Sequence, residues 1–370
     1  MYSDADRAHM GRALALARHG LYTTTPNPRV GCVIVREGRV VGEGWHRQTG
    51  EPHAEILALA QAGGRARGAT VYVTLEPCSH QGRTPPCTDM LVEAGVARVI
   101  TAMEDPNPLV NGQGLERLRA AGVDVRCGLM EQEAVDLNVG FVSRMTRGRP
   151  WARLKIAASF DGITALPDGR SQWITSAAAR ADGHQWRARA CAILTGIGTV
   201  KSDNPQLNVR GVFTPRQPAR VLIDSRLEVN PAAELFRDAK VLVIHALPQE
   251  SVAPERTARL QEVGCELLSL PDAAGKVDLA AALRELGRRE INELHIEAGY
   301  KLNGSLLAAG CVDELLVYLA PSLLGKGQQL FNLPAVADLE SRIGLQWLDV
   351  ERIGEDLRLR AKVQGRPPAA

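Results

Sequence analysis

The first third of the chain alternates between helical and strand-like spacing of its hydrophobic residues. Apolar residues at positions 10, 13, 14 and 17 predict one face of a helix, with Ser3 and Asp6 as a capping box and Gly20 at its end. The same patterning predicts helices at 53–62, 88–94 and 115–121, and strands at 30–35, 40–41, 70–75, 98–102 and 123–126. This alternation predicts a central sheet covered by helices on both faces.

The alternation restarts after a polar tetrapeptide, Arg147-Gly148-Arg149-Pro150, which contains both Gly and Pro. Beyond it we expect strands at 151–158, 193–195, 221–224, 241–245, 293–297 and 314–319, and helices at 178–190, 279–288 and 302–309. We therefore divide the chain into two α/β domains, residues 1–146 and residues 147–370.

Length and composition agree with this division and exclude several classes of protein. At about 150 residues per domain, 370 residues favour two domains. A net charge of +2 and an aromatic content of 4% argue against a nucleic-acid surface. The chain has no run of 18 apolar residues that would predict a membrane span, and its polar N-terminus does not resemble a secretory signal. Seven cysteines, an odd number, favour reduced thiols in a cytoplasm over a disulfide framework.

One group of residues has the composition of a catalytic zinc site. His53 and Glu55 are followed by Cys78, after a proline, and then by Cys87. One imidazole and two thiolates suit zinc, and three protein ligands leave a fourth position open. A glutamate two residues after the histidine is placed to move a proton, as in zinc deaminases. The interval between the cysteines is eight residues rather than the two of the short motif.

The alternative for these residues is that they are ordinary packing residues, because a lone buried His or Cys is common. Three ligand types and a glutamate in motif order favour zinc catalysis over that alternative. For the remaining cysteines packing is the expected role, because each lies in or beside an apolar run: Cys32, Cys127, Cys191, Cys265 and Cys311.

The second domain carries a weaker signal for a dinucleotide. Gly196 and Gly198 follow a predicted strand but lack the third glycine of the Rossmann fingerprint. Glu297 ends another strand, and Gly299 then allows close backbone approach at a helix N-terminus. Arg226, after a third strand, is suited to a 2′-phosphate. From spacing alone, cofactor binding and a purely structural role both stay open.

Several segments closely resemble bacterial bifunctional riboflavin-biosynthesis proteins of the RibD type. The most specific is the long metal loop, Pro77-Cys78-Ser79-His80-Gln81-Gly82-Arg83-Thr84-Pro85-Pro86-Cys87. The other matching segments are 26–32, 44–46 and 105–108 in the first domain and 154–162, 171–175, 198–205, 223–226 and 297–299 in the second. The resemblance implies a cytidine-deaminase-like three-layer α/β/α domain followed by a dihydrofolate-reductase-like α/β domain. The second fold explains the absence of a Rossmann fingerprint.

For the deaminase domain, the resemblance implies that His53, Cys78 and Cys87 bind zinc and that Glu55 is the proton shuttle. It also implies that the substrate contacts Asn27, His46, His80, Arg83, Asp105 and Asn107. An amide and a carboxylate can pair with ring nitrogens and amines, and the two histidines with Arg83 can hold a phosphate. The alternatives are a turn role for Asn27, between two prolines, and a rigid-loop role for the 105–108 segment.

For the reductase domain, the resemblance implies NADPH as cofactor, bound by Ala157, Trp173, Thr199, Asp203, Ser225, Gly299, Tyr300, Lys301, Leu302, Asn303, Gly304 and Ser305. It implies that the sugar phosphate contacts Lys155, Ser171, Thr175, Arg187, Leu207, Arg210 and Glu297. The guanidinium groups of Arg187 and Arg210 suit a phosphate dianion. The alternative for Arg187 is a solvated helix face, because Arg180 and Arg189 lie near it.

We therefore expect a cytoplasmic, homo-oligomeric enzyme that deaminates a diaminopyrimidine carrying a phosphoribosylamino group and then reduces the ribosyl group to ribityl. Its cofactors would be zinc and NADPH, its substrate a small molecule, and neither nucleic acid nor a membrane its partner. Two rivals remain. One is a nucleic-acid editing deaminase, which the near-neutral charge disfavours; the other is a zinc-stabilised binding module, which the open fourth ligand position and Glu55 disfavour.

Overall fold

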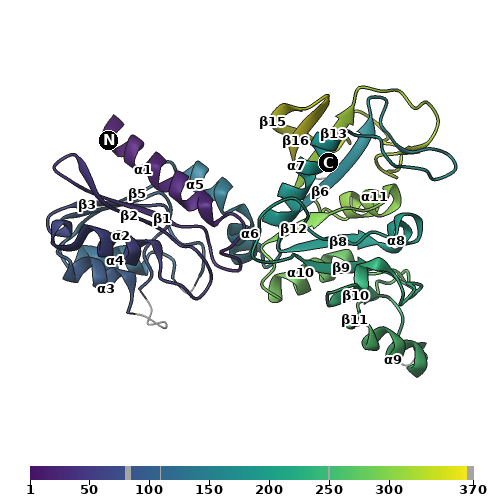
Figure 1. The fold of residues 1–370 in the computed structure, drawn as a ribbon, viewed down its shortest axis with the longest axis horizontal. Helices are drawn as coiled ribbons and strands as arrows, with labels where there is room; N and C mark the ends of the chain where they lie inside the picture. The colour runs from purple at the N-terminus through teal and green to yellow at the C-terminus, as the bar shows by residue number, and fades with distance from the viewer. Residues whose placement is uncertain (80–84, 109, 249–250, 365–370) are drawn as a thin grey trace. The chain divides into compact units, whose positions relative to one another are not determined.

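The structure, a computed structural model, describes residues 1–79, 85–108, 110–248 and 251–364, so His80 and Arg83 lie outside the described residues. Two compact units are present, Met1–Gly148 and Arg149–Ala370 (Figure 1). The first unit ends with helix α6 (Val139–Arg147), whose C-cap Gly148 has a left-handed φ of 66°. The domain boundary expected after residue 146 therefore falls in the last turn of this helix. None of the described helices is long and apolar enough to span a membrane.

The first unit contains a five-stranded sheet in the order β2-β1-β3-β4-β5. The strands are β1 (Gly31–Arg36), β2 (Arg39–Trp45), β3 (Thr70–Val73), β4 (Arg98–Thr101) and β5 (Asp124–Cys127). Strand β1 is antiparallel to both β2 and β3, whereas β3, β4 and β5 are parallel. The expected strands are therefore present. Their ends differ from the prediction by at most two residues, except that β2, expected at 40–41, continues to Trp45.

Helices cover both faces of this sheet, which confirms the three-layer prediction (Figure 1). On one face α1 (Asp4–Ala17) packs with α5 (Glu131–Leu137); on the other lie α2 (Ala54–Ala62), α3 (Cys87–Glu93) and α4 (Gln113–Ala120). The apolar stripe of α1 is buried, and the Ser3–Asp6 capping box is formed. The predicted end at Gly20 belongs to a short 3₁₀ turn, Arg18–Gly20, that continues from the helix.

Two glycines of β2 let the metal-site helix approach the sheet. A Cβ at Gly42 would lie 2.2 Å from the Ala58 carbonyl oxygen, and one at Gly44 would lie 2.3 Å from that of Ala54. Only glycine fits such a contact, so α2 packs directly on β2. This packing places the N-terminus of α2 next to the end of β2.

The second unit contains a nine-stranded sheet in the order β11-β10-β9-β8-β12-β6-β13-β16-β15. The strands are β6 (Trp151–Ser159), β8 (Ala192–Gly196), β9 (Ala219–Ile223), β10 (Val241–His245), β11 (Cys265–Ser269), β12 (Glu293–Ile296), β13 (Glu314–Ala320), β15 (Leu345–Ile353) and β16 (Asp356–Val363). In this sheet order, neighbouring strands from β11 through to β13 are parallel, whereas β16 is antiparallel to β13 and β15 is antiparallel to β16. A separate pair joins β7 (Ile163–Ala165) and β14 (Gln328–Gln329).

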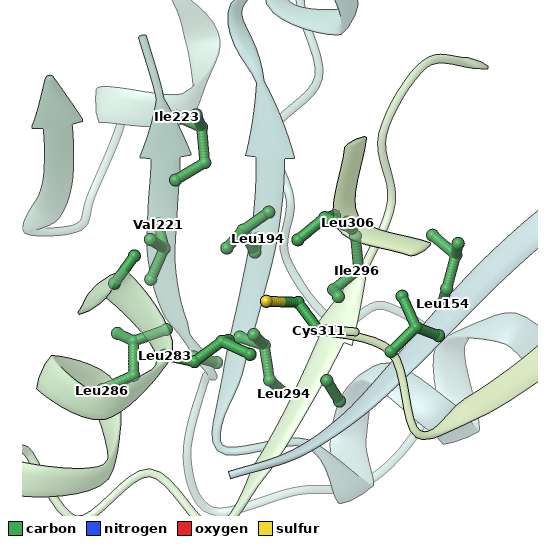
Figure 2. Packing of buried hydrophobic residues seen from close by; sticks show 14 of the residues in the cluster. Leu154, Leu194, Val221, Ile223, Leu283, Leu286, Leu294, Ile296, Leu306 and Cys311 are labelled. Carbon is green, nitrogen blue, oxygen red and sulfur yellow. The ribbon is translucent and has the colours of Figure 1, made fainter. Parts of the chain in front are cut away.

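Alternate side chains of the central strands face two different cores. One core joins the sheet to α10 (Leu279–Arg288) and α11 (Tyr300–Ala308), and Figure 2 shows Leu194, Ile296 and Leu283 within it. The opposite core holds Leu222, Val243 and Leu260. The helices associated with this opposite face are α7 (Ala177–Arg189), α8 (Ile197–Asp203) and α9 (Pro254–Glu262), with a 3₁₀ turn at Glu234–Phe236. Because both faces are covered, the central strands read as continuous apolar runs.

The hydrophobic pattern missed several elements. The elements that were not predicted are helices α5, α6, α8 and α9 and strands β7, β11, β14, β15 and β16. The omissions lie largely at the sheet edges and in short helices, where burial on one face is incomplete.

Candidate functional site

The three predicted zinc ligands converge in the first unit. His53 is the N-cap of α2, Cys78 lies in the loop after β3, and Cys87 is the first residue of α3. The Nδ1 atom of His53 lies 3.6 Å from the Cys78 sulfur and 3.4 Å from the Cys87 sulfur. Zinc bonds of about 2.0–2.1 Å to nitrogen and about 2.3 Å to sulfur, at a tetrahedral angle, separate the two atoms by about 3.5 Å. The residues therefore fit a tetrahedral zinc ion.

The two thiols share hydrogen bonds in a way that favours ionisation of one of them. The Cys87 thiol and the His53 ring stabilise the Cys78 thiolate and lower its pKa to about 4, against the opposing effect of burial. The backbone N–H of Cys87 also donates to the Cys78 sulfur at 3.4 Å. The same shared proton raises the pKa of Cys87. A divalent cation takes the place of that proton when it binds thiolates.

Among the described residues, only these three side chains form a group of three or more His, Cys, Asp or Glu side chains able to hold a metal. Three protein ligands leave the fourth tetrahedral position for water or substrate, which is typical of a catalytic zinc site.

Glu55 lies in the first turn of α2 and is buried, with 3% of its surface exposed. Burial raises its pKa, and His53 partly offsets this effect. A carboxyl group with a raised pKa next to a metal site is suited to accept and return a proton. The glutamate thus has the position that the zinc-deaminase pattern predicts.

Asn27 and His46 form a hydrogen-bonded pair beside the metal ligands. The Pro52 carbonyl accepts from Nδ1 of His46 at 3.3 Å, so Nε2 accepts from the Asn27 amide at 3.1 Å. Burial lowers the pKa of His46, and its ring centroid lies 5.4 Å from that of His53. In the structure His46 therefore orients Asn27, and its contact with a substrate phosphate stays a prediction.

Glu76 organises the loop that carries Asp105 and Asn107. Its carboxylate accepts backbone N–H groups of Asp105 at 3.0 Å, Gly112 at 2.9 Å and Gly114 at 2.7 Å. The Asn107 N–H in turn donates to Asp105 Oδ1 at 2.9 Å. Glu76 was not among the predicted site residues. The signal that could have found it is an acidic residue two positions before a metal ligand.

A large pocket of about 1440 Å³ lies at the carboxyl ends of the parallel strands of the second unit. Open α/β sheets bind ligands at this edge. The volume exceeds the roughly 300–1,000 Å³ typical of a single small ligand, so there is room for a cofactor and a substrate together. All but two of the predicted reductase residues line it, namely Lys155, Ala157, Ser171, Trp173, Thr175, Arg187, Thr199, Asp203, Leu207, Arg210, Ser225, Glu297, Gly299, Tyr300, Lys301, Leu302 and Asn303.

The two exceptions have structural contacts on α11. A Cβ at Gly304 would lie 2.1 Å from the Asn332 carbonyl oxygen, so this glycine permits close packing of the chain. The Ser305 hydroxyl is exposed and donates to the Lys301 carbonyl at 3.1 Å. Gly304 and Ser305 are therefore not among the residues that line the pocket, and their contact with the cofactor stays a prediction.

Glu297 and Arg187 form a two-pronged ion pair in the pocket wall. The guanidinium contacts the carboxylate oxygens at 2.5 and 2.8 Å and donates a third hydrogen bond to the Asn208 carbonyl at 2.9 Å. Burial alone would raise the pKa of Glu297, but Arg187 outweighs it and holds that pKa well below the usual range. Burial also lowers the pKa of Lys155, against the attraction of Glu297. The pocket therefore contains a fixed carboxylate beside a desolvated amine.

Two helix N-termini also line the pocket. Helix α8 begins after Gly196, and helix α11 begins after Gly299. A Cβ at Gly299 would lie 3.7 Å from the Thr199 hydroxyl. Two N-termini on one pocket offer backbone N–H groups to phosphates.

The two sites define a two-domain enzyme with a zinc-dependent deaminase unit and a reductase unit. Residues 3–103 match the cytidine and deoxycytidylate deaminase zinc-binding region, and residues 150–359 match the RibD C-terminal domain. The riboflavin biosynthesis protein RibD of Escherichia coli K12 is 46% identical over 96% of this chain and 98% of its own length. That of Aquifex aeolicus is 41% identical over 96% and 98%.

Solved structures agree over the full length. RibD of Acinetobacter baumannii superposes with a TM-score of 0.89 at 41% identity, covering 98% of this chain and 99% of that one. A diaminohydroxyphosphoribosylaminopyrimidine deaminase/5-amino-6-(5-phosphoribosylamino)uracil reductase of Thermotoga maritima gives a TM-score of 0.85 at 34% identity, covering 97% and 99%. The chain belongs to the RibD family of bifunctional deaminase/reductase enzymes of riboflavin biosynthesis, whose cofactors are zinc and NADPH.

Proposed function

We propose that the first unit hydrolyses an amine from 2,5-diamino-6-(5-phosphoribosylamino)pyrimidin-4-one and that the second reduces the ribosyl group of the product to ribityl. The observation that carries this proposal is the pairing, in one chain, of a His53/Cys78/Cys87 site beside Glu55 with a pocket large enough for two ligands. The activities in the name of the Thermotoga maritima relative support it. The direct test is metal content, ammonia release and NADPH oxidation measured with this pyrimidine.

In the deaminase unit, His53, Cys78 and Cys87 would hold zinc. When bound, zinc would supply Lewis-acid chemistry that makes water nucleophilic at neutral pH. Glu55 is placed to accept a proton from the attacking water and to pass it on, so that water and the aminopyrimidine give the carbonyl and ammonia. Asn27, held by His46, and Asp105, held by Glu76, orient the ring by pairing with its nitrogens and amines.

In the reductase unit, the pocket holds NADPH and the sugar phosphate together. NADPH, when bound, supplies a hydride, and one proton is taken up as the ribosyl group becomes ribityl. The backbone at the starts of α8 and α11 binds phosphates of the cofactor. Lys155 and Glu297 face the sugar, with Glu297 kept ionised by Arg187.

We expect the two reactions to be ordered. Deamination replaces a hydrogen-bond donor on the ring, the amine, with an acceptor, the carbonyl. A reductase pocket that pairs with the carbonyl would leave buried polar groups unpaired when the undeaminated ring binds, and each unpaired group costs roughly 1–3 kcal/mol. Glu55→Ala protein supplied with the diaminopyrimidine phosphate and NADPH should therefore oxidise little NADPH. Adding a separately expressed fragment of residues 1–146, provided that it folds, should restore oxidation. Rapid NADPH oxidation by the variant before ammonia appears would refute this order.

We expect turnover with NADPH to exceed turnover with NADH because Arg226 supplies a cation for the 2′-phosphate. Arg226 is exposed, follows β9 and lines the pocket. Replacing it with alanine should reduce the NADPH/NADH ratio of kcat/KM by roughly 10-fold or more, the worth of one hydrogen bond to a charged group. Arg259→Ala, which removes an exposed cation from α9, is the matched control. Equal kcat/KM for the two cofactors in the wild type would refute the assignment.

We also propose a cytoplasmic homo-oligomer acting on small molecules rather than nucleic acid. All seven cysteines are free thiols, which suits a reducing compartment. Edge strand β15 exposes Trp347 by 62% and Val350 by 56%, and an apolar edge of this kind favours pairing with another copy of the chain. The solution mass tests the oligomer, and filter binding with RNA tests the nucleic-acid alternative.

A further inference from the structure

His184 lies in the wall of the reductase pocket, yet none of the roles assigned above uses it. It is half-buried on α7, three residues before Arg187, so the two side chains share one face of the helix. Arg180 and Gly183 lie on the same face, and all four residues line the pocket. His184 was not among the residues predicted for either site.

One hydrogen bond determines which ring nitrogen of His184 carries the proton. The backbone N–H of Arg210 donates to Nδ1 at 3.2 Å, so Nδ1 is the acceptor and Nε2 bears the hydrogen. Within the described part of the chain, Nε2–H has no protein acceptor. The imidazole therefore presents an unused donor of defined tautomer in a ligand pocket.

Burial and the charges around His184 favour the neutral form of this ring. Burial, followed by Arg187 on α7, Arg210 in the following loop and Lys155 on β6, lowers the pKa of His184 to about 4, while Glu297 beyond β12 acts in the opposite direction. Three cations and one carboxylate therefore surround a neutral donor. This excess of positive charge is suited to a dianion.

The contacts of Arg187 change the expected composition of the phosphate subsite. Its Nε and Nη2 atoms donate to the Glu297 carboxylate, and Nη1 donates to the Asn208 carbonyl. The guanidinium is therefore not free to bind a phosphate through two parallel hydrogen bonds. Arg210 and His184 are joined through the Arg210 backbone, and both line the pocket. They are therefore neighbouring donors in the pocket lining, although one N–H of the Arg210 guanidinium also donates to the Gln206 side chain at 3.2 Å.

We propose that His184 is a binding residue of the reductase site, whose Nε2–H donates to an oxygen of the substrate's phosphate group beside Arg210. This inference rests on the proposed reductase function, because it specifies the phosphate subsite of that same pocket. A neutral donor of fixed tautomer adds a directed hydrogen bond without adding a further positive charge.

The test compares His184→Leu, which has no donor, with His184→Gln, which keeps a neutral donor and an acceptor. In the full-length protein, His184→Leu should raise KM for the deaminated pyrimidine phosphate by roughly 10- to 100-fold, the range for one hydrogen bond to a charged group. The KM for NADPH and kcat should change little, because the contact is remote from the reacting carbon. His184→Gln should recover most of the loss. Gln185→Leu, at an exposed position of α7, is the matched control.

Competition by ribose 5-phosphate and by D-ribose separates this inference from the proposed function. If the wild type binds both sugars equally, the pocket has no phosphate subsite and the proposed reductase function is contradicted. If the wild type prefers ribose 5-phosphate and His184→Leu keeps that preference, only the role of His184 is overturned. His184→Glu keeps an acceptor for the Arg210 amide but has no N–H, so we expect it to bind ribose 5-phosphate no better than the leucine variant. Wild-type binding by His184→Glu would show that the residue only holds the Arg210 loop.

Discussion

Glu55→Ala is expected to retain a full equivalent of zinc and to deaminate at least about a hundredfold more slowly than the wild type. The metal is held by His53, Cys78 and Cys87, so removing the carboxylate leaves all three ligands in place. What is lost is the group that takes and returns the proton, and a positioned acid–base group contributes about 10²–10⁴ in rate. Metal analysis and ammonia release on the same protein sample measure both quantities.

The control for this variant is Glu93→Ala, which removes an exposed carboxylate from α3. It should behave like the wild type in both assays. NADPH oxidation by Glu55→Ala with the deaminated pyrimidine should also be normal, because the reductase pocket lies in the other unit. Ammonia release within a factor of a few of wild type would mean that Glu55 is not the proton shuttle.

Cys78→Ala is expected to lose zinc and deamination together. Two remaining protein ligands hold zinc poorly, because a catalytic site normally has three in addition to the open position. The variant also removes the sulfur that accepts the Cys87 N–H at 3.4 Å, so the metal loop loses a contact as well as a ligand. Zinc content after dialysis and ammonia release are the measurements.

Cys127→Ala is the matched control for this prediction, since it removes a half-buried thiol of the same unit that is not part of the metal group. It should keep both zinc and activity. A full zinc equivalent in purified Cys78→Ala would contradict the ligand assignment, whatever the activity of that protein.

The sequence predicted the central strands of both sheets well. These strands are buried on one face or on both, so their apolar residues either alternate with polar ones or form a continuous run. The prediction failed at β16 for a specific reason. On that strand Arg358 is buried and Arg360 is half-buried, whereas Leu357 is 40% exposed, so the alternation of apolar and polar residues does not follow the burial. The two guanidinium groups lie 5.7 and 4.8 Å from the ring centroid of Trp186. Acidic partners compensate their charges, namely Asp182, Glu314, Asp349 and Glu351.

The two sites differ in how far the sequence could define them. The zinc ligands could be predicted because coordination chemistry restricts them to a few residue types, and Glu55 because the zinc-deaminase motif places a glutamate two residues after the histidine. His184 has no such restriction, since a histidine on a helix is usually unremarkable. Its importance depends on the Arg210 amide, which lies 26 positions later in the chain and contacts it only after folding.

The sequence by itself determined the two α/β units, the zinc chemistry and the family, because each rests on local periodicity or on residue types that chemistry restricts. The tertiary structure decided which predicted residues share a pocket and what each can still bind. It paired Arg187 with Glu297, joined Asn27 to His46 and excluded Gly304 and Ser305 from the pocket lining. The physical reason is that hydrogen bonds and charge pairs join residues far apart in the chain. The order of apolar and polar residues along the sequence does not specify the distances between such residues.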